Sequence, residues 1–235
     1  YKFTGWSLDN RYVEQFEMPA KNVVLKAEFR GNEYLVQYDA NEDSKGTAQG
    51  SMSTVSTEYD LEIEIGINQF VLQGYVFDSW NSKADGTGDK YLPGMVVKNL
   101  TNTDGDVITL YAIWKPATDT EYKVNVYQVM SVKDGIYEAP TLMYSKNKNG
   151  TTGDTTSETI EDKKGFTAEI NQVVIAPDGS SVVNIYYVRN TYMLTWNLNG
   201  GTADNEYTEG EVYYNDRVTI PSVTKQGYIL SWDMD

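Results

Sequence analysis

Three side chains with oxygen donors occur at every second position of one short polar segment. Asp85, Thr87 and Asp89 lie in the sequence Asp-Gly-Thr-Gly-Asp, and alternating oxygen ligands are typical of calcium-binding loops. Such a loop also needs glycine at its sixth position and an acidic residue at its twelfth, but Lys90 and Val96 occupy these positions. We therefore interpret the segment as a solvated turn, and we expect neither a metal nor any other cofactor.

Carboxylates could also do acid–base chemistry in this chain. Pairs among the 34 Asp and Glu residues could act on a glycan, but with so many acidic residues pairs arise by chance, and none stands out. The chain has no Cys and no His, which excludes thiol nucleophiles, histidine bases, disulfides and Cys/His zinc sites. We expect a protein that is not an enzyme and has no catalytic residues.

The net charge of −15 limits the classes of partner. Nucleic acids and anionic membranes attract basic surfaces, so we predict no nucleic-acid partner. No apolar run approaches the roughly 18 residues of a membrane span, so we also predict no membrane insertion. The acidic residues are interpreted as a solvated surface.

The elements that position these side chains are predicted to be short β-strands. The chain is 40% hydrophobic, with 19 Tyr, 5 Trp and 6 Phe, and these residues occur in short alternating runs. The segment 74–114 begins with Gly-Tyr-Val-Phe-Asp-Ser-Trp and ends with Ile-Thr-Leu-Tyr-Ala-Ile-Trp. Its beginning recurs at 1–6 and 227–232, and its end recurs at 23–29. Such self-similarity indicates a repeat array.

The repeats divide the chain into four predicted modules. Residues 1–30 form the C-terminal half of a repeat, and 31–116 form a complete repeat. Residues 117–190 form a different β module, and 191–235 form the N-terminal half of a further repeat. Strands are expected at 23–29, at 34–41, around the alternating Leu61, Ile63 and Ile65, and from 192 onward; a short helix is an alternative for 160–175.

These motifs resemble the Listeria–Bacteroides repeat, also called the internalin B-repeat family. The resemblance covers 1–30, 34–114 and 191–235, and two departures are Asn41-Glu42-Asp43 in place of Asn-Gly-Gly and Ser79 in place of Gly. The residues that fit it best are Asn199-Gly200-Gly201, Pro221, Gly227-Tyr228, Gly74-Tyr75 and Trp114. Residues 117–190, which end in Tyr-Tyr-Val-Arg-Asn, resemble the mucin-binding-protein-like modules that accompany such repeats.

The resemblance implies a β-rich α+β fold, built from tandem small β-grasp-like modules in an elongated array. It implies a secreted or cell-wall-anchored bacterial protein with a stalk, adhesion or surface-display role. It supplies no catalytic residues. The expected partners are other copies of the chain, neighbouring modules of the same protein, or a host or microbial surface glycan or protein.

The recurring aromatic residues have two interpretations. They could stack on a sugar, but in a domain too small for a generous core such residues more often supply buried area, and we favour the core. Trp6, Trp80 and Trp232 remain candidates for ligand binding or assembly. The whole set is Phe3, Trp6, Tyr75, Phe77, Trp80, Trp114, Tyr228 and Trp232.

A covalent crosslink is a further candidate. Lys–Asn isopeptide bonds of some surface domains join the first and last strands beside an acidic residue, and Lys123 and Asn190 occupy roughly such places. An exposed lysine and an asparagine at a strand end are the more ordinary interpretation. The intact mass distinguishes the two, because the crosslink releases ammonia.

The half repeats suggest a form of assembly. Each half alone would expose a sheet edge, which is a template for pairing. The halves could be trimming artefacts, could join within one chain, or could join between chains as a head-to-tail filament. We therefore expect a stalk or adhesion segment that assembles head to tail. The alternative is a specific glycan- or host-protein-binding module, and a remote third option is an appendage of a surface enzyme.

Overall fold

The computed structural model describes residues 1–133 and 135–229, and it confirms a β-rich protein with several small sheets. The chain forms two compact units, Tyr1–Thr118 and Asp119–Asp235. Helix within the described residues is limited to one short 3₁₀ turn, η1, at Asp43–Lys45. None of the helical structure in this described part could cross a membrane.

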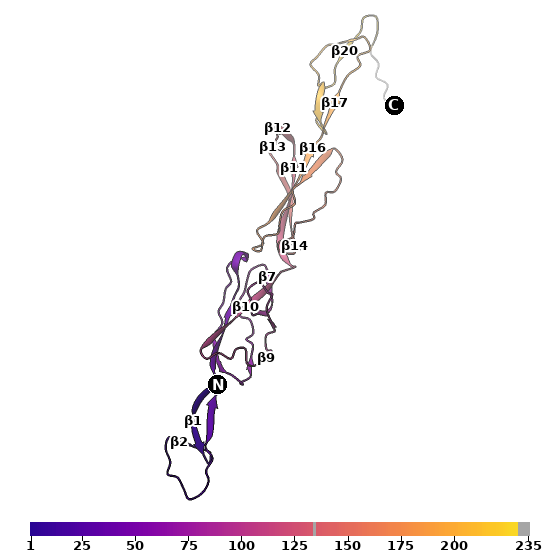
Figure 1. Ribbon diagram of the computed structural model, residues 1–235. Coiled ribbons are helices and arrows are strands. Elements are labelled where there is room, and N and C mark those ends of the chain that lie inside the picture. Colours follow the sequence, from indigo (N-terminus) through magenta and orange to yellow (C-terminus); the bar gives the residue numbers. More distant parts are fainter. Residues whose placement is uncertain (134, 230–235) are drawn as a thin grey trace. The chain divides into compact units, whose positions relative to one another are not determined.

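The complete repeat is built on a five-stranded mixed sheet (Figure 1). Its first and last strands are parallel neighbours at the centre, and the other pairs are antiparallel. A two-stranded ribbon of β6 and β9 lies outside this sheet. In sheet order, the five strands are β5 (Val55–Glu58), β4 (Glu33–Asp39), β10 (Asp106–Pro116), β7 (Tyr75–Asn81) and β8 (Lys90–Tyr91), and the ribbon pairs β6 (Ile63–Glu64) with β9 (Val96–Val97).

Alternation along the strands decides which side chains enter the core of this sheet. In β4, Tyr34 and Val36 are fully buried, whereas Leu35 between them is exposed. The core is completed from the other strands and from the loop before β7. Its buried members are Tyr34, Val36, Ile65, Trp80, Leu110 and Ala112.

Residues 120–189 form a second mixed sheet with the same central plan. Its first and last strands, β11 and β16, are parallel neighbours, β14 lies beside β11, and β15 lies beside β16. The strand order of this sheet, β14-β11-β16-β15, corresponds to the order β5, β4, β10 and β7 in the complete repeat. The strands are β11 (Thr120–Val129), β14 (Thr141–Gly150), β15 (Phe166–Ile170) and β16 (Val182–Arg189), with a separate ribbon of β12 (Ser131–Lys133) and β13 (Ile136–Glu138).

The short helix considered for 160–175 is wrong, because β15 occupies the middle of this range. Phe166, Ala168 and Ile170 alternate with more exposed residues, which is the period of a strand. β15 also pairs antiparallel with β16, so its backbone groups are satisfied by a neighbouring strand.

The segments 1–30 and 191–229, which the sequence predicts to be half repeats, form smaller sheets. The strand predicted from Val23 begins only at Lys26, and the strand predicted from Tyr192 ends at Leu194. The strands of the N-terminal part are β1 (Lys2–Leu8), β2 (Arg11–Val13) and β3 (Lys26–Arg30), and those of the C-terminal part are β17 (Thr191–Leu194), β18 (Thr202–Ala203), β19 (Gly210–Tyr213) and β20 (Val223–Thr224).

Candidate functional site

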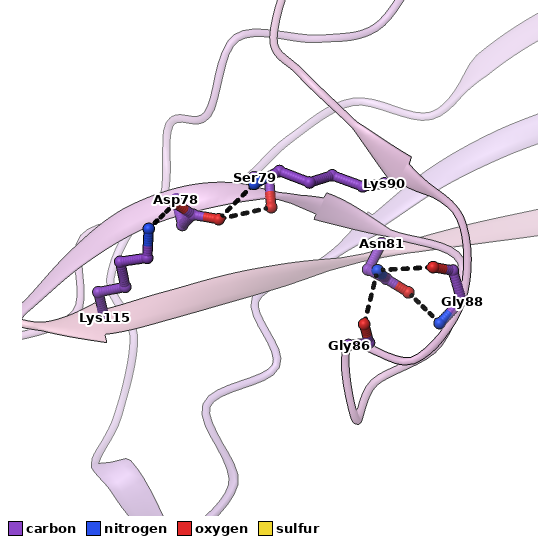
Figure 2. A network of polar contacts seen from close by, with 7 residues as sticks. All are labelled: Asp78, Ser79, Asn81, Gly86, Gly88, Lys90 and Lys115. Carbon is purple, nitrogen blue, oxygen red and sulfur yellow. Dashed lines mark hydrogen bonds and ion pairs between the residues drawn. The ribbon is translucent and has the colours of Figure 1, made fainter.

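The turn that follows β7 is held by a single buried side chain, that of Asn81 (Figure 2). Its amide nitrogen donates to the carbonyls of Gly86 at 3.1 Å and Gly88 at 3.2 Å. Its oxygen accepts from the backbone N–H of Lys83 at 2.9 Å and of Gly88 at 3.0 Å. The polar residues of this turn are therefore organised around Asn81, a residue that the sequence analysis did not single out.

Asp85 forms hydrogen bonds within the turn and does not converge with Asp89 on a common metal site. Its carboxylate accepts from the backbone N–H of Thr87 at 3.0 Å and from the Thr87 hydroxyl at 2.7 Å, and these bonds lower the pKa of Asp85. The backbone N–H of Asp89 donates instead to the Ser82 hydroxyl at 2.8 Å. No group of three or more acidic, His or Cys side chains suited to a metal occurs within 1–133 and 135–229.

Asp78 is the centre of an ion-pair network that joins three strands (Figure 2). Lys115 of β10 contacts one carboxylate oxygen, while Lys90 of β8 lies 2.9 Å from the other. The Ser79 hydroxyl donates to the same carboxylate at 3.0 Å. The hydrogen bond from Lys115, and to a smaller extent that from Lys90, holds the pKa of Asp78 far below its usual range. The sequence gives no signal for this network, because its members meet only through strand pairing.

We expect the substitution Asp78→Asn to cost about 1 kcal/mol at pH 7, since both lysines are more than half exposed and solvent screens them. The folded state lowers the pKa of Asp78, so its contribution is present above the unfolded pKa near 4 and is lost as pH falls below it. Urea unfolding should therefore separate the variant from the unchanged chain at pH 7, and the gap should narrow steadily as pH falls from 4 toward 2. A gap of the same size at pH 2 as at pH 7 would contradict this assignment.

Three motif aromatics of the complete repeat belong to its core: Trp80 is buried in it, and Phe77 and Trp114 pack against it. Trp80 has no exposed surface, and its ring lies 5.0 Å from that of Phe77. The indole N–H of Trp80 donates to the Gly66 carbonyl at 2.9 Å, and that of Trp114 donates to the Ala40 carbonyl at 2.7 Å. Trp80 thus has no free face on which a ligand could stack.

The same motif lies at the surface in the N-terminal half repeat. Phe3 packs edge-on against Trp6 and against Phe29, with ring centroids 5.7 Å apart in both pairs. All three side chains are about half exposed. In the C-terminal half repeat, Tyr228 is exposed, and Trp232 lies outside the described residues. Of the two candidate tryptophans that the structure describes, Trp6 is therefore accessible and Trp80 is not.

The structure does not bring Lys123 and Asn190 together. Lys123 is opposite Val182, the first residue of β16, whereas Asn190 follows Arg189, the last residue of that strand. The Asn190 side chain instead accepts from the Thr167 hydroxyl at 2.7 Å. The measurement of intact mass remains the direct test of a crosslink.

A buried carboxylate lies in the module formed by residues 120–189. The Tyr122 hydroxyl donates to Glu158 at 2.8 Å, and the Lys148 ammonium lies 2.7 Å from the same carboxylate. The Glu158 side chain is 4% exposed. Burial raises the pKa of Tyr122 to about 12, and the Glu158 carboxylate adds to this effect. Sequence reasoning missed this trio, because its members lie on separate segments.

The comparisons with known proteins agree with the repeat pattern. Residues 34–113 and 192–232, just over half of the chain, match the model of the Listeria-Bacteroides repeat domain. Residues 1–33 match the divergent InlB B-repeat domain. Both matches cover modules in which the short segment from a tyrosine to a tryptophan recurs, at 1–6, 75–80 and 228–232.

Two relatives come from Evansella cellulosilytica. One is named as a membrane protein and is 31% identical over 119 residues, which are 48% of this chain and 17% of that protein. The other is named as a Gly-rich membrane protein and is 31% identical over 147 residues, which are 57% of this chain and 15% of that protein. The chain thus spans less than a fifth of each relative.

Proposed function

Because this chain belongs to the Listeria-Bacteroides repeat domain family, we propose that it is a non-catalytic segment of a bacterial cell-surface protein, acting as a stalk and adhesion element. The observation that carries this proposal is that residues in and beside the motif of the complete repeat stabilise its fold. Trp80 is in the core, Asn81 holds a turn, and Asp78 ties three strands together. The motif thus specifies a folded spacer.

The proposal extends to the architecture of the segment. A mixed sheet with parallel central strands, present at 33–116 and at 120–189, supports β-grasp-like modules in an elongated array. Closing strands also lead into opening strands with few residues between them: 31–32 separate β3 from β4, 117–119 separate β10 from β11, and 190 separates β16 from β17. Such short connections suit a spacer built from successive modules. We assign the mucin-binding-protein-like module to 117–190 and place the protein outside the cell or on the cell wall.

A specific glycan- or host-protein-binding module is the second candidate. The exposed cluster of Phe3, Trp6 and Phe29 favours it, since exposed aromatic rings can stack on sugars. A spacer would instead leave these residues for contact between repeats.

A glycan array and a panel of host surface proteins, probed with the whole chain, separate the two functions. A stalk gives no signal above that of an unrelated acidic protein. A signal that Trp6→Ala abolishes and Tyr144→Ala, at an exposed site on β14, leaves unchanged would overturn the stalk function in favour of the binding module. Antibody labelling of intact source cells tests the surface location.

We further propose that this segment assembles head to tail. The exposed side chains of Trp6 and Tyr192 support this idea.

A further inference from the structure

The first and last strands of the complete repeat are parallel neighbours at the centre of its sheet. Residues 34–39 of β4 pair in register with residues 106–111 of β10. The same arrangement occurs in the module at 120–189, where residues 123–129 of β11 pair with residues 182–188 of β16. The chain therefore enters each of these modules on one central strand and leaves it on the strand beside it.

This arrangement decides how tension along the chain acts on a module. Because the chain enters at the start of β4 and leaves at the end of β10, tension pulls β4 backward and β10 forward along their common axis. The hydrogen bonds of a parallel pair are spaced evenly along the strands. Shear between the strands therefore loads these bonds together, and none of them can open ahead of the others.

The core side chains also oppose sliding of the two strands. Val36 of β4 and Leu110 of β10 are fully buried in one core, and Val124 of β11 and Val183 of β16 are fully buried in the core of the other module. A slip by one residue turns the wrong face of a strand toward the core. The next register that keeps the buried face inside lies two residues away, or about 6.6 Å along the strand.

A side-chain hydrogen bond joins the two parallel strands at the same place in both modules. The Gln37 amide nitrogen donates to the Thr109 hydroxyl at 2.7 Å, and the Asn125 amide nitrogen donates to the Asn184 side-chain oxygen at 3.3 Å. Each donor lies directly opposite its acceptor in the ladder. Each donor also follows the buried tyrosine of its opening strand at the same spacing. The bond is thus a shared feature of the two pairs.

The connections carry tension to these strands and not to the loops. Residues 117–119 alone separate β10 from β11, so little chain can extend before the next pair is loaded. The long segments that could unravel, 40–105 and 130–181, lie between the paired strands in sequence. Tension does not reach them while the parallel pair holds.

We propose that each parallel pair, β4 with β10 and β11 with β16, is a mechanical clamp that bears tension along the chain, reinforced by the Gln37–Thr109 and Asn125–Asn184 hydrogen bonds. This load-bearing function rests on the proposed stalk function. It goes beyond a spacer, because it assigns resistance to one pair of strands in each module and to one direction of pull.

Single-molecule force spectroscopy on the full chain tests the clamp by changing the direction of pull. The chain has no cysteine, so two introduced thiols are its only handles. Glu33→Cys with Thr118→Cys pulls the β4–β10 pair from opposite ends and shears it. Glu33→Cys with Thr103→Cys pulls from one end, where the Glu33 N–H donates to Asp104 at 3.1 Å, and opens the bonds one after another. We expect an unfolding force at least about twofold higher in the first geometry.

A matched substitution tests the side-chain bond. Thr109→Val removes the acceptor of Gln37 with little change in volume, whereas Thr103→Val makes the same change at an exposed site outside the strands. Both are measured with thiols at 33 and 118 under a constant load. Thr109→Val should raise the unfolding rate about fivefold, the factor that one ordinary hydrogen bond contributes, and Thr103→Val should leave it unchanged.

The outcomes separate the clamp from the stalk function. Equal unfolding forces in the two directions of pull, or a higher force in the same-end direction, overturn the clamp. An unchanged unfolding rate in Thr109→Val removes the side-chain bond from it. Neither result affects the stalk function, which is contradicted only by a ligand signal that Trp6→Ala abolishes.

Discussion

Replacing Trp80 by alanine lowers the free energy of unfolding of the complete repeat by about 3–5 kcal/mol, the usual loss for a fully buried tryptophan. The ring lies 4.7 Å from Tyr38, 5.0 Å from Phe77 and 6.2 Å from Phe70, so its removal opens a cavity among aromatic neighbours. The Gly66 carbonyl also loses the donor that it has at 2.9 Å. Urea unfolding followed by circular dichroism measures the loss.

The matched control is Trp6→Ala, at the equivalent position of the N-terminal half repeat. Trp6 is exposed there, so the same substitution should cost no more than about 1 kcal/mol in a dilute solution of single chains. Equal losses in the two variants would mean that the half repeat has a closed core of its own, which would also remove the basis for assembly.

Alternation in the sequence was enough to predict the opening strand of the complete repeat, but not every strand that is paired within the chain, because β15 lies where a short helix was considered. Tyr34 and Val36 point inward and Leu35 outward, which is the pattern that the opening strand of the repeat displays. The same pattern misplaced the ends of two strands, at Val23 and beyond Leu194. A strand continues only where a neighbouring segment forms hydrogen bonds with its backbone. Alternation within one strand does not indicate which segment that neighbour will be.

The ion-pair network around Asp78 could not be predicted from the sequence, for a related reason. Asp78 meets Lys90 and Lys115 because β7 lies between β8 and β10, and nothing in the spacing of these residues indicates it. The Asp-Gly-Thr-Gly-Asp segment, in contrast, was read from its own spacing, and its failure to match a calcium loop could be judged without a structure. Local chemistry could thus be predicted, whereas chemistry made by strand order could not.

Strand order also relates the two kinds of module. Residues 120–189 lie outside the ranges matched by the repeat models, yet their four strands follow the order of β5, β4, β10 and β7. The first strand is similar too, since Tyr122 and Val124 are buried as Tyr34 and Val36 are. The modules differ in the hydrogen bonding of the hydroxyl group of this first-strand tyrosine. The Tyr34 hydroxyl is buried without a hydrogen-bond partner among the described residues, whereas the Tyr122 hydroxyl binds Glu158.

This difference leads to the second large effect, in the variant Glu158→Ala. The substitution removes the acceptor of the buried Tyr122 hydroxyl and the partner of Lys148 together. Lys148 is 41% exposed and can turn toward water, so the main penalty is the unpaired hydroxyl and the lost packing. We expect a loss of about 2–4 kcal/mol in the stability of this module. The control is Glu121→Ala, at the exposed residue that precedes Tyr122 in β11. It should cost less than about 0.5 kcal/mol by the same urea measurement.

The pH dependence identifies the hydroxyl as the cause. The folded state raises the pKa of Tyr122 to about 12, above the ordinary value of 10.0. Its contribution to stability is therefore complete below pH 10 and is lost as pH rises toward 12. Tyr122→Phe should flatten this alkaline decline in part, because Tyr137, which donates to Glu169, also has its pKa raised to about 12 and remains. An alkaline decline that is the same in the variant and the unchanged chain would show that folding does not raise the pKa of Tyr122, and the effect of Glu158→Ala would then come from its packing and from Lys148.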